Sequence, residues 1–356
     1  MISPLFLPAR LVLGASRTIA AIFCVAVMTG SASGAHKAIA FDAPGAQLTL
    51  AIAINDAGQV AGTFGYAGEL TSPYSHGFLR EPSGEITTFE VAADQDSMFV
   101  TGINKYGQIA GYYVVGSQSY GFIRDPDGTV AIFSVPAADD GTFVWGINDS
   151  GEVSGSYNLG GSEFGFVRNR QGTLTPFGSP TTFTAVAEAI NASGTVAGYY
   201  STGPTEHAFI RNRSTLVSFD AAASAATVPK AMNRPGQIAG YYYFPNNGEL
   251  GFHGFLRNVD GAITSFDAPE AGTSATTGTF TWAMNDSGAI TGYVITKYIT
   301  NRGFVRDSLG NAETFNVLNA SKNAYKGTWA YSINAAGTVT GFFIDDAGLW
   351  HGFIRF

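Results

Sequence analysis

The chain has 356 residues, of which 13% are charged and 45 are glycine, a bias that favours short strands and many turns. Its single cysteine, Cys24, lies near the N-terminus, so the remainder offers no disulfide, thiolate metal site or cysteine nucleophile. Beyond residue 35 the chain keeps 17 basic and 27 acidic residues, and this net charge of −10 disfavours nucleic acid and anionic membranes as partners.

Residues 1–35 have the three-part layout of a secretory signal. Arg10 and Arg17 precede the uncharged run 18–28, and small residues fill 31–35. We expect cleavage after Ala35 and a location in the periplasm, at the cell surface or outside the cell. The alternative is an uncleaved membrane anchor, which the two arginines and the small-residue tail disfavour. Bulky Phe23 before the cysteine argues against lipid attachment.

From residue 50 onward one pattern recurs, an Asn-x-x-Gly turn followed by a Gly-Phe-x-Arg segment. The spacing between successive repeats is 42 to 52 residues, which indicates stacked supersecondary units. Units are therefore expected near 50–92, 98–136, 142–180, 184–222, 227–269, 278–318 and 327–356. Their turn asparagines are Asn55, Asn104, Asn148, Asn191, Asn233, Asn285 and Asn334.

The second unit, residues 98–136, shows how one repeat is built. Four runs of five to six residues, rich in β-branched and aromatic side chains, are separated by Gly, Asn, Asp and Pro. Such a segment predicts a four-stranded antiparallel meander. The Asn-x-x-Gly turn predicts a tight hairpin between strands one and two, since the asparagine caps its own backbone and the glycine takes positive φ.

The repeated polar residues have structural and functional interpretations. Asp56, Asp149 and Asp286 follow turn asparagines and suggest calcium, but no unit has a DxDxDG loop, so we favour the hairpin. Each third strand ends in an arginine, for which turn capping or pairing with a neighbouring unit is favoured over anion binding. Histidines precede the third-strand Gly-Phe or Ala-Phe pair in four units, and the repeat holds them apart, so no metal or cofactor is expected. They are His76, His207, His253 and His351.

The two ends of the chain predict how the units are closed. The last unit stops before its fourth strand, whereas residues 38–44 read AIAFDAP, like the fourth-strand segment ITSFDAP at 263–269. We therefore predict an all-β, seven-bladed β-propeller over residues 36–356, whose N-terminal strand 38–44 completes the last blade. An open solenoid would need capping units. An outer-membrane barrel needs strands of about 9 to 11 residues, about twice as long as these runs.

The fourth unit carries a resemblance to a known family. Asn191, in the segment AINASG, is followed by His207, Ala208 and Phe209, and this pattern resembles the HAF-type repeats of exported bacterial proteins. The resemblance covers residues 51–356, although six of the seven third strands have Gly-Phe in place of Ala-Phe. It implies an exported, propeller-like protein and no particular activity.

Loop lengths give a prediction for a ligand site. The segments 62–77, 240–254, 266–285 and 315–334 are longer than their equivalents, belong to units 5, 6, 7 and 1, and emerge on one face. Because loops on a rigid scaffold commonly bind ligands, we expect ligand contact along this arc. Its candidate aromatic residues are Tyr66, Tyr74, Phe244, Tyr325, Trp329 and Trp350.

Two classes of function fit these patterns. The favoured one is a monomeric binding module for a glycan or a cell-surface partner, in which aromatic residues supply apolar contact. The alternative is a glycoside hydrolase or lyase with paired carboxylates in the central funnel. The sequence has no nucleophile elbow, no HExxH motif and no phosphate loop to indicate other chemistry. Candidate acids for the alternative are Glu69, Asp94, Asp96, Glu188, Glu249 and Glu270.

Overall fold

The computed structural model separates residues 1–35 from a compact unit, residues 36–356. It describes residues 37–67, 75–178, 184–213, 215–222, 224–244 and 251–356. The predicted signal segment lies outside these residues, as do Tyr74, Glu69 and Glu249. The described residues form strands and no helix, so none of them forms a helix that could cross a membrane.

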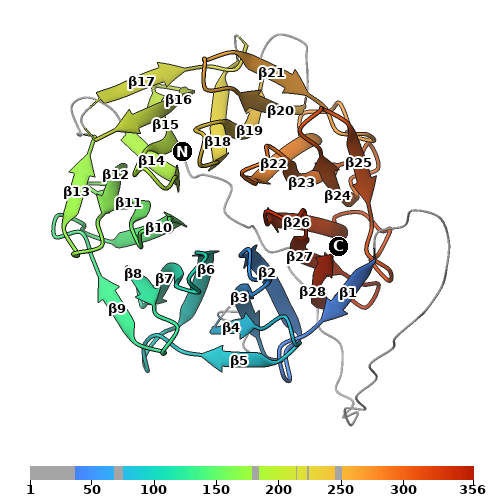
Figure 1. Cartoon of the computed structure of the whole chain (residues 1–356), viewed down its shortest axis with the longest axis horizontal. Helices are drawn as coiled ribbons and strands as arrows, with labels where there is room; N and C mark the ends of the chain where they lie inside the picture. Colours follow the sequence, from blue (N-terminus) through green and yellow to red (C-terminus); the bar gives the residue numbers. More distant parts are fainter. Residues whose placement is uncertain (1–36, 68–74, 179–183, 214, 223, 245–250) are drawn as a thin grey trace. The chain divides into compact units, whose positions relative to one another are not determined.

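Within residues 36–356 the strands pair antiparallel in chain order, in repeated groups of four. The groups follow the repeats of the sequence and are numbered here as units 1 to 7. Figure 1 shows them around a common centre, with the first strand of each unit innermost and the fourth outermost.

The first strands each carry a β-bulge. Their register with the second strand shifts at the residue three positions before the turn asparagine, for example between Val144 and Gly146. A bulge bends the strand and redirects the side chain of the extra residue. The first strands are β2 (Leu48–Ile54), β6 (Ser97–Ile103), β10 (Gly141–Ile147), β14 (Thr184–Ile190), β18 (Ala226–Met232), β22 (Gly278–Met284) and β26 (Gly327–Ile333).

The second strands contain a glycine seven residues after the turn asparagine, and the packing explains it. A Cβ on Gly111 would lie 2.0 Å from the carbonyl oxygen of Phe99 and 2.9 Å from the ring of Phe122. Only glycine permits this approach of the first strand. The second strands are β3 (Val60–Gly65), β7 (Ile109–Val115), β11 (Val153–Leu159), β15 (Val196–Thr202), β19 (Ile238–Tyr243), β23 (Ile290–Ile295) and β27 (Val339–Ile344).

The third strands supply the core phenylalanine and the repeated arginine. The phenylalanine of every Gly-Phe or Ala-Phe pair is fully buried, as Phe122 and Phe304 illustrate. These side chains therefore form the centre of each unit's hydrophobic core. The third strands are β4 (His76–Arg80), β8 (Gln118–Arg124), β12 (Ser162–Arg168), β16 (Thr205–Asn212), β20 (Phe252–Arg257), β24 (Asn301–Arg306) and β28 (Trp350–Arg355).

The fourth strands are short and lie at the outer rim (Figure 1). In unit 7 this place is taken by β1 (Ala38–Phe41), which pairs antiparallel with β28, with Ala40 opposite Phe353. The other fourth strands are β5 (Ile86–Phe89), β9 (Val130–Phe133), β13 (Leu174–Phe177), β17 (Thr215–Phe219), β21 (Ile263–Phe266) and β25 (Ala312–Phe315).

Fourth-strand phenylalanines join neighbouring units. The ring of Phe266 in unit 5 meets the ring of Phe304 in unit 6 edge-to-face, at 6.2 Å between centroids. The guanidinium carbon of Arg306 lies 4.9 Å from the Phe266 centroid. Since Phe266 belongs to unit 5's fourth strand β21, both contacts cross from unit 5 to unit 6. Phe41 makes the equivalent contacts with Phe78 and Arg80 of unit 1.

Turn asparagines make a second set of contacts between units. The side-chain oxygen of Asn334 accepts backbone hydrogen bonds from its own hairpin, as predicted, at 3.1 and 3.0 Å. Its side-chain nitrogen donates to the backbone carbonyl of Asn55 in unit 1, at 3.2 Å. This second role is not evident from the sequence, because the spacing of the asparagines does not show which backbone carbonyl each one meets. Equivalent bonds run from Asn55 to Asn104, Asn104 to Asn148, Asn148 to Asn191, Asn233 to Asn285 and Asn285 to Asn334.

The aspartates and histidines that suggested metal binding have protein partners. Asp56 accepts a hydrogen bond from the backbone N–H of Ala335, at 2.8 Å, and so bridges unit 1 and unit 7. Asp149 and Asp286 accept equivalent bonds from the unit before each. The histidines pair with the acid that directly follows the adjacent fourth strand. These pairs are His76 with Glu90, His207 with Asp220, His253 with Asp267 and His351 with Asp42.

Candidate functional site

The bulged residue of each first strand is the position at which the repeat changes its chemistry. Every unit has the same turn asparagine, second-strand glycine, third-strand phenylalanine and third-strand arginine. The bulged residue, in contrast, is aliphatic, polar, charged or aromatic, depending on the unit. Since the first strands lie innermost (Figure 1), we call the seven residues at this position the inner ring, and all but Tyr331 are partly exposed. The inner ring consists of Ile52, Thr101, Trp145, Glu188, Lys230, Trp282 and Tyr331.

Contacts within the inner ring run through four successive units. The Nζ atom of Lys230 lies 2.8 Å from Oε2 of Glu188 and 4.7 Å from the centroid of the Trp282 ring. The Trp282 ring meets Tyr331 edge-to-face at 4.8 Å. The lysine and glutamate side chains are 15% and 11% exposed, so the ion pair is shielded but within reach of solvent. This arrangement fixes the orientation of one large aromatic side chain beside a charged pair.

A hydrogen-bonded chain extends the inner ring at unit 3. Nε1 of Trp145 donates to Oγ of Ser156 at 2.8 Å, and that hydroxyl donates to the carboxylate of Glu163 on the third strand. Burial raises the pKa of Glu163, the Ser156 hydrogen bond opposes this, and the negative charges of Glu188 and Glu206 raise it further. Burial and the charge of Glu188 also raise the pKa of Glu206. Three carboxylates are thus electrostatically coupled across units 3 and 4.

Aromatic side chains surround these polar groups. Tyr112 stacks on Phe99 at 4.8 Å and meets Phe143 and Trp145 at 5.2 and 5.7 Å. Burial raises the pKa of Tyr112, and also that of Tyr241 and Tyr293, so these hydroxyls stay neutral donors. The inner ring therefore presents flat apolar surfaces next to carboxylates and an ammonium group. Among the described residues, no group of three or more His, Cys, Asp or Glu could hold a metal.

Two of the aromatic residues predicted from loop lengths lie close to the inner ring. Phe342 is sandwiched between Trp329 and Trp350, with 4.9 Å between centroids on each side and interplanar angles of 14° and 6°. Phe342 also stacks on Tyr331 of the inner ring at 5.5 Å. The structure thus brings Trp329 and Trp350 together in unit 7, half-buried and continuous with the inner ring.

The other described candidates lie on separate loops. Tyr66 is 40% exposed and packs against His76 of unit 1 at 4.8 Å. Phe244 packs against Tyr242 and His253 of unit 5. Tyr325 is 72% exposed in the loop before β26. These residues do not converge on one site, and their role in ligand contact stays a prediction.

Of the six candidate acids, Glu188 lies in the inner ring and Glu270 lies in a loop of unit 6, described below. The candidate acids do not include Glu163 and Glu206, whose pKa values are raised by burial and by the charge of Glu188. Loop lengths carry no information about residues within strands, such as these two acids. Aligning the units on their turn asparagines would have exposed the bulged position, since its residue type changes at each step.

Comparison with known proteins identifies the fold. No protein-family model matches the chain, and no curated protein does. The solved structure of a streptogramin B lyase is 13% identical, with a TM-score of 0.58, over 90% of this chain and 98% of that one. Virginiamycin B lyase from Staphylococcus aureus is 12% identical, with a TM-score of 0.60, over 90% and 100%. The β-propeller domain of the Trilobed protease from Pyrococcus furiosus is 10% identical, with a TM-score of 0.55, over 87% and 94%.

These likenesses establish an all-β propeller built of repeated four-stranded antiparallel blades, as the sequence predicted. At identities of 10 to 13% they concern the fold alone, because one propeller scaffold serves many activities. The resemblance to HAF-type repeats, with no matching family model, stays a prediction.

Proposed function

We propose that residues 36–356 form an exported, closed propeller of seven blades that acts as a binding module. Closure is supported by three contacts between the chain ends. Strand β1 pairs with β28 of unit 7, Phe41 packs on Phe78 of unit 1, and Asn334 donates to Asn55. A rigid closed frame suits binding, since it holds side chains from different blades in fixed positions.

The proposed ligand is a neutral glycan bound at the inner ring. The observation that supports this proposal is the set of residues at the bulged position. It includes Trp145, Trp282 and the Glu188–Lys230 ion pair, whereas the rest of each unit repeats the same residues. Sugar rings offer an apolar face to an indole and hydroxyl groups to carboxylates, so this surface fits them. The acidic net charge of the chain does not oppose an uncharged ligand.

A polysaccharide-cleaving enzyme is the second candidate, and the pKa of Glu163 favours it. Burial holds this carboxyl protonated to higher pH than usual, while Glu188 forms an ion pair with Lys230. Glycosidases use a pair of carboxyl groups, one of which is kept protonated to act as the general acid, and a carboxyl group with a raised pKa suits that role. In this candidate Glu163 donates a proton to the glycosidic oxygen.

A binding screen tests the proposed module. Mature protein, residues 36–356, is presented to neutral glycans and cell-wall polysaccharides, and any hit is measured again with Trp282→Ala. Loss of this aromatic anchor should weaken binding by about 2 kcal/mol, or roughly thirtyfold. Tyr106→Ala is the control, because Tyr106 is an aromatic residue that is 63% exposed in a hairpin turn and is not part of the inner ring. Undiminished binding by Trp282→Ala refutes the inner-ring site.

Two further variants separate the alternatives. Trp350→Ala tests the contribution of the predicted loop arc to the same ligand. Release of new reducing ends from a bound polysaccharide, abolished by Glu163→Gln with binding retained, establishes catalysis. Binding without product supports the module alone.

A further inference from the structure

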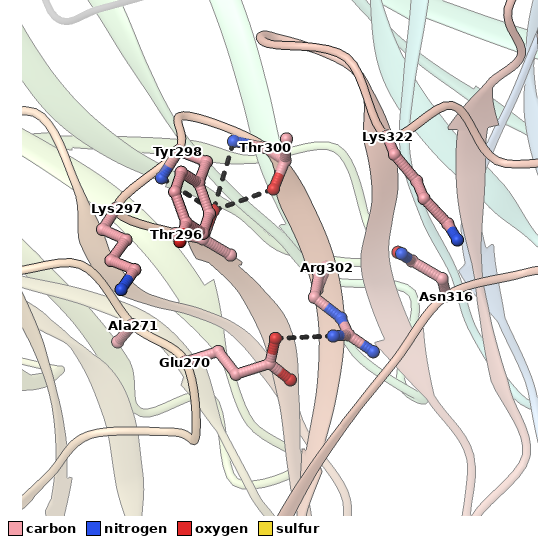
Figure 2. A pocket seen from close by; sticks show the side chains of 9 residues that line it. All are labelled: Glu270, Ala271, Thr296, Lys297, Tyr298, Thr300, Arg302, Asn316 and Lys322. Atoms are coloured by element: carbon pink, nitrogen blue, oxygen red, sulfur yellow. Dashed lines mark hydrogen bonds and ion pairs between the residues drawn. The ribbon is translucent and has the colours of Figure 1, made fainter.

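Three loops of units 6 and 7 form a pocket of about 890 Å³, and no inner-ring residue lines it (Figure 2). They are the loop 267–277 between β21 and β22, the loop 296–300 between β23 and β24, and the loop 316–326 between β25 and β26. Two of them belong to the long segments of the predicted arc. The volume is within the range of small-molecule sites.

Backbone hydrogen bonds between the loops hold the pocket in shape. Ala271 and Thr296 form an antiparallel bridge, and the N–H of Gly272 donates to the carbonyl of Ile295 at 3.0 Å. The N–H of Tyr325 donates to the carbonyl of Ile299 at 2.7 Å. All three loops are therefore tied into one assembly, so that a ligand would meet a preformed site.

The same loops contain most of the strained backbone of the described chain. Six described residues other than glycine have positive φ, and four of them lie here, with φ from 61° to 72°. The value of 61° at Ile299 is unusual, because a β-branched side chain disfavours the left-handed region. Strain of this kind is concentrated at functional sites. The four residues are Glu270, Ile299, Asn319 and Tyr325.

The charge of the pocket is opposite to that of the chain. Lys297, Arg302 and Lys322 face a single acid, Glu270, in a protein that is strongly acidic overall. Glu270 is engaged on both oxygens, accepting from Nη1 of Arg302 at 2.5 Å and from the hydroxyl of Thr314 at 2.7 Å. Nε of Arg302 is buried and has no hydrogen-bond partner. The local excess is about two positive charges, which suits a monoanion better than a more highly charged group.

Donors and a flat aromatic surface complete the pocket. Figure 2 shows Lys322 and Asn316 together on the side of Arg302 away from Glu270, where an anion would meet an ammonium and an amide as well as the guanidinium. Tyr298 is 71% exposed, and Nζ of Lys297 lies 5.0 Å from its ring centroid. An exposed phenol ring beside cationic donors matches a ligand that combines a ring with a carboxylate.

We propose that this pocket binds a hexuronate residue of an acidic oligosaccharide. Its carboxylate is held by Arg302, Lys322 and Asn316, and its ring packs on Tyr298. The proposal stands apart from the neutral-glycan site at the inner ring, since no residue is shared between the two sites.

Titration calorimetry with a hexuronate trisaccharide tests the proposal on the mature protein. Binding should weaken about tenfold in Lys322→Gln, through loss of a charge-assisted contact, and by a similar factor in Tyr298→Ala. Both side chains are exposed, so the variants are expected to fold, which near-ultraviolet circular dichroism checks. Arg170→Gln, in a turn of unit 3, removes one positive charge elsewhere and should leave binding unchanged.

Comparison ligands make the outcome decisive. The neutral trisaccharide of the same linkage should bind at least about tenfold more weakly than the hexuronate. Equal binding of the neutral sugar, stronger binding of inorganic phosphate, or no hexuronate binding at millimolar concentration would overturn the proposal. Trp282→Ala should leave hexuronate binding intact, so failure of the inner-ring proposal is distinguishable from failure of this one.

Discussion

The repeated arginines illustrate how one residue can serve the contact between blades. Arg257 lies with its guanidinium carbon 4.9 Å from the ring centroid of Phe219, and its Nη1 donates to the carbonyl of Asn258 at 3.2 Å. The first contact crosses to the preceding blade, and the second caps the turn that follows the strand. The sequence predicted both roles, turn capping and contact with a neighbouring unit. The partner ring was not, because a sequence does not reveal which fourth strand the arginine faces.

The second-strand glycines give a prediction at the same scale. Gly111→Ala should destabilise the fold by about 3 kcal/mol, because the new methyl group would overlap the carbonyl of Phe99 and press on Phe122. Gly116→Ala is the matched control. Nothing lies within 4 Å of its Cβ position, and its φ of 59° alone predicts a loss of about 1 kcal/mol. Urea unfolding measures both, and equal losses would contradict the steric explanation.

At the scale of the strand, β1 joins the two ends of the chain. Beyond its four backbone pairs, the backbone N–H of Phe356 donates to the carbonyl of Lys37 at 2.9 Å. His351 of β28 hydrogen-bonds Asp42 at 2.9 Å and lies 3.5 Å from Asp345. These contacts were anticipated only in part. The repeat of the FDAP segment predicted the strand, whereas the role of Asp42 required a view of its neighbour.

Deleting residues 37–44 should lower the melting temperature of the protein comprising residues 36–356. The deletion removes the strand beside β28 and takes Phe41 from its contacts with Phe78 and Arg80. Loss of the contacts of this partly buried phenylalanine alone corresponds to about 2 kcal/mol. Differential scanning calorimetry of the two forms provides the measurement. Equal melting temperatures would show that β1 contributes nothing to the fold.

His351 makes the stability of the contact between β1 and β28 depend on pH. The hydrogen bond to Asp42 raises the pKa of His351 above 6.5, against the effect of burial, and the charges of Asp42 and Asp345 raise it further. Because the folded pKa is raised, this stabilisation is fully present below pH 6.5, the unfolded value, and is lost as pH rises through the folded pKa.

We therefore expect the melting temperature of the wild type to fall more steeply with rising pH, from about 6 to 8, than that of Asp42→Asn. The variant keeps the shape of the side chain and removes its charge. Parallel pH profiles for the two proteins would exclude a contribution from this pair.

At the scale of the whole molecule, the division between frame and site explains how far sequence reasoning extends. Turn asparagines, second-strand glycines and core phenylalanines recur because every blade has the same hairpin, the same close approach of strands and the same core. The regular spacing of these residues therefore predicts the fold. At the inner-ring position, in contrast, the residue type differs from unit to unit, so no repeat pattern predicts it. Glu188, Lys230 and Trp282 become neighbours only when successive first strands gather around one centre (Figure 1). Glu163 and Glu206 lie on the third strands of successive units, and the charge of Glu206 raises the pKa of Glu163. No sequence spacing predicts this interaction.

A closed ring has no special junction, and this gives a test of the whole architecture. Asn285 donates to the carbonyl of Asn334 at 2.9 Å, between units 6 and 7, whereas Asn334 donates to Asn55 at 3.2 Å, between the last unit and the first. Each side-chain oxygen also accepts two backbone hydrogen bonds from its own hairpin. Apart from the Ser287 hydroxyl, which also donates to Asn285, the two sites are matched.

Asn285→Ala and Asn334→Ala should therefore destabilise the protein by similar amounts, about 2 to 4 kcal/mol each, because both leave buried backbone groups unsatisfied. Urea unfolding of the two variants and the wild type provides the free energies. In an open array the contact between the ends would be weak, and Asn334→Ala would cost only its hairpin contribution. A loss for Asn334→Ala that is smaller by more than about 1 kcal/mol would exceed the effect of the extra serine contact and would refute closure.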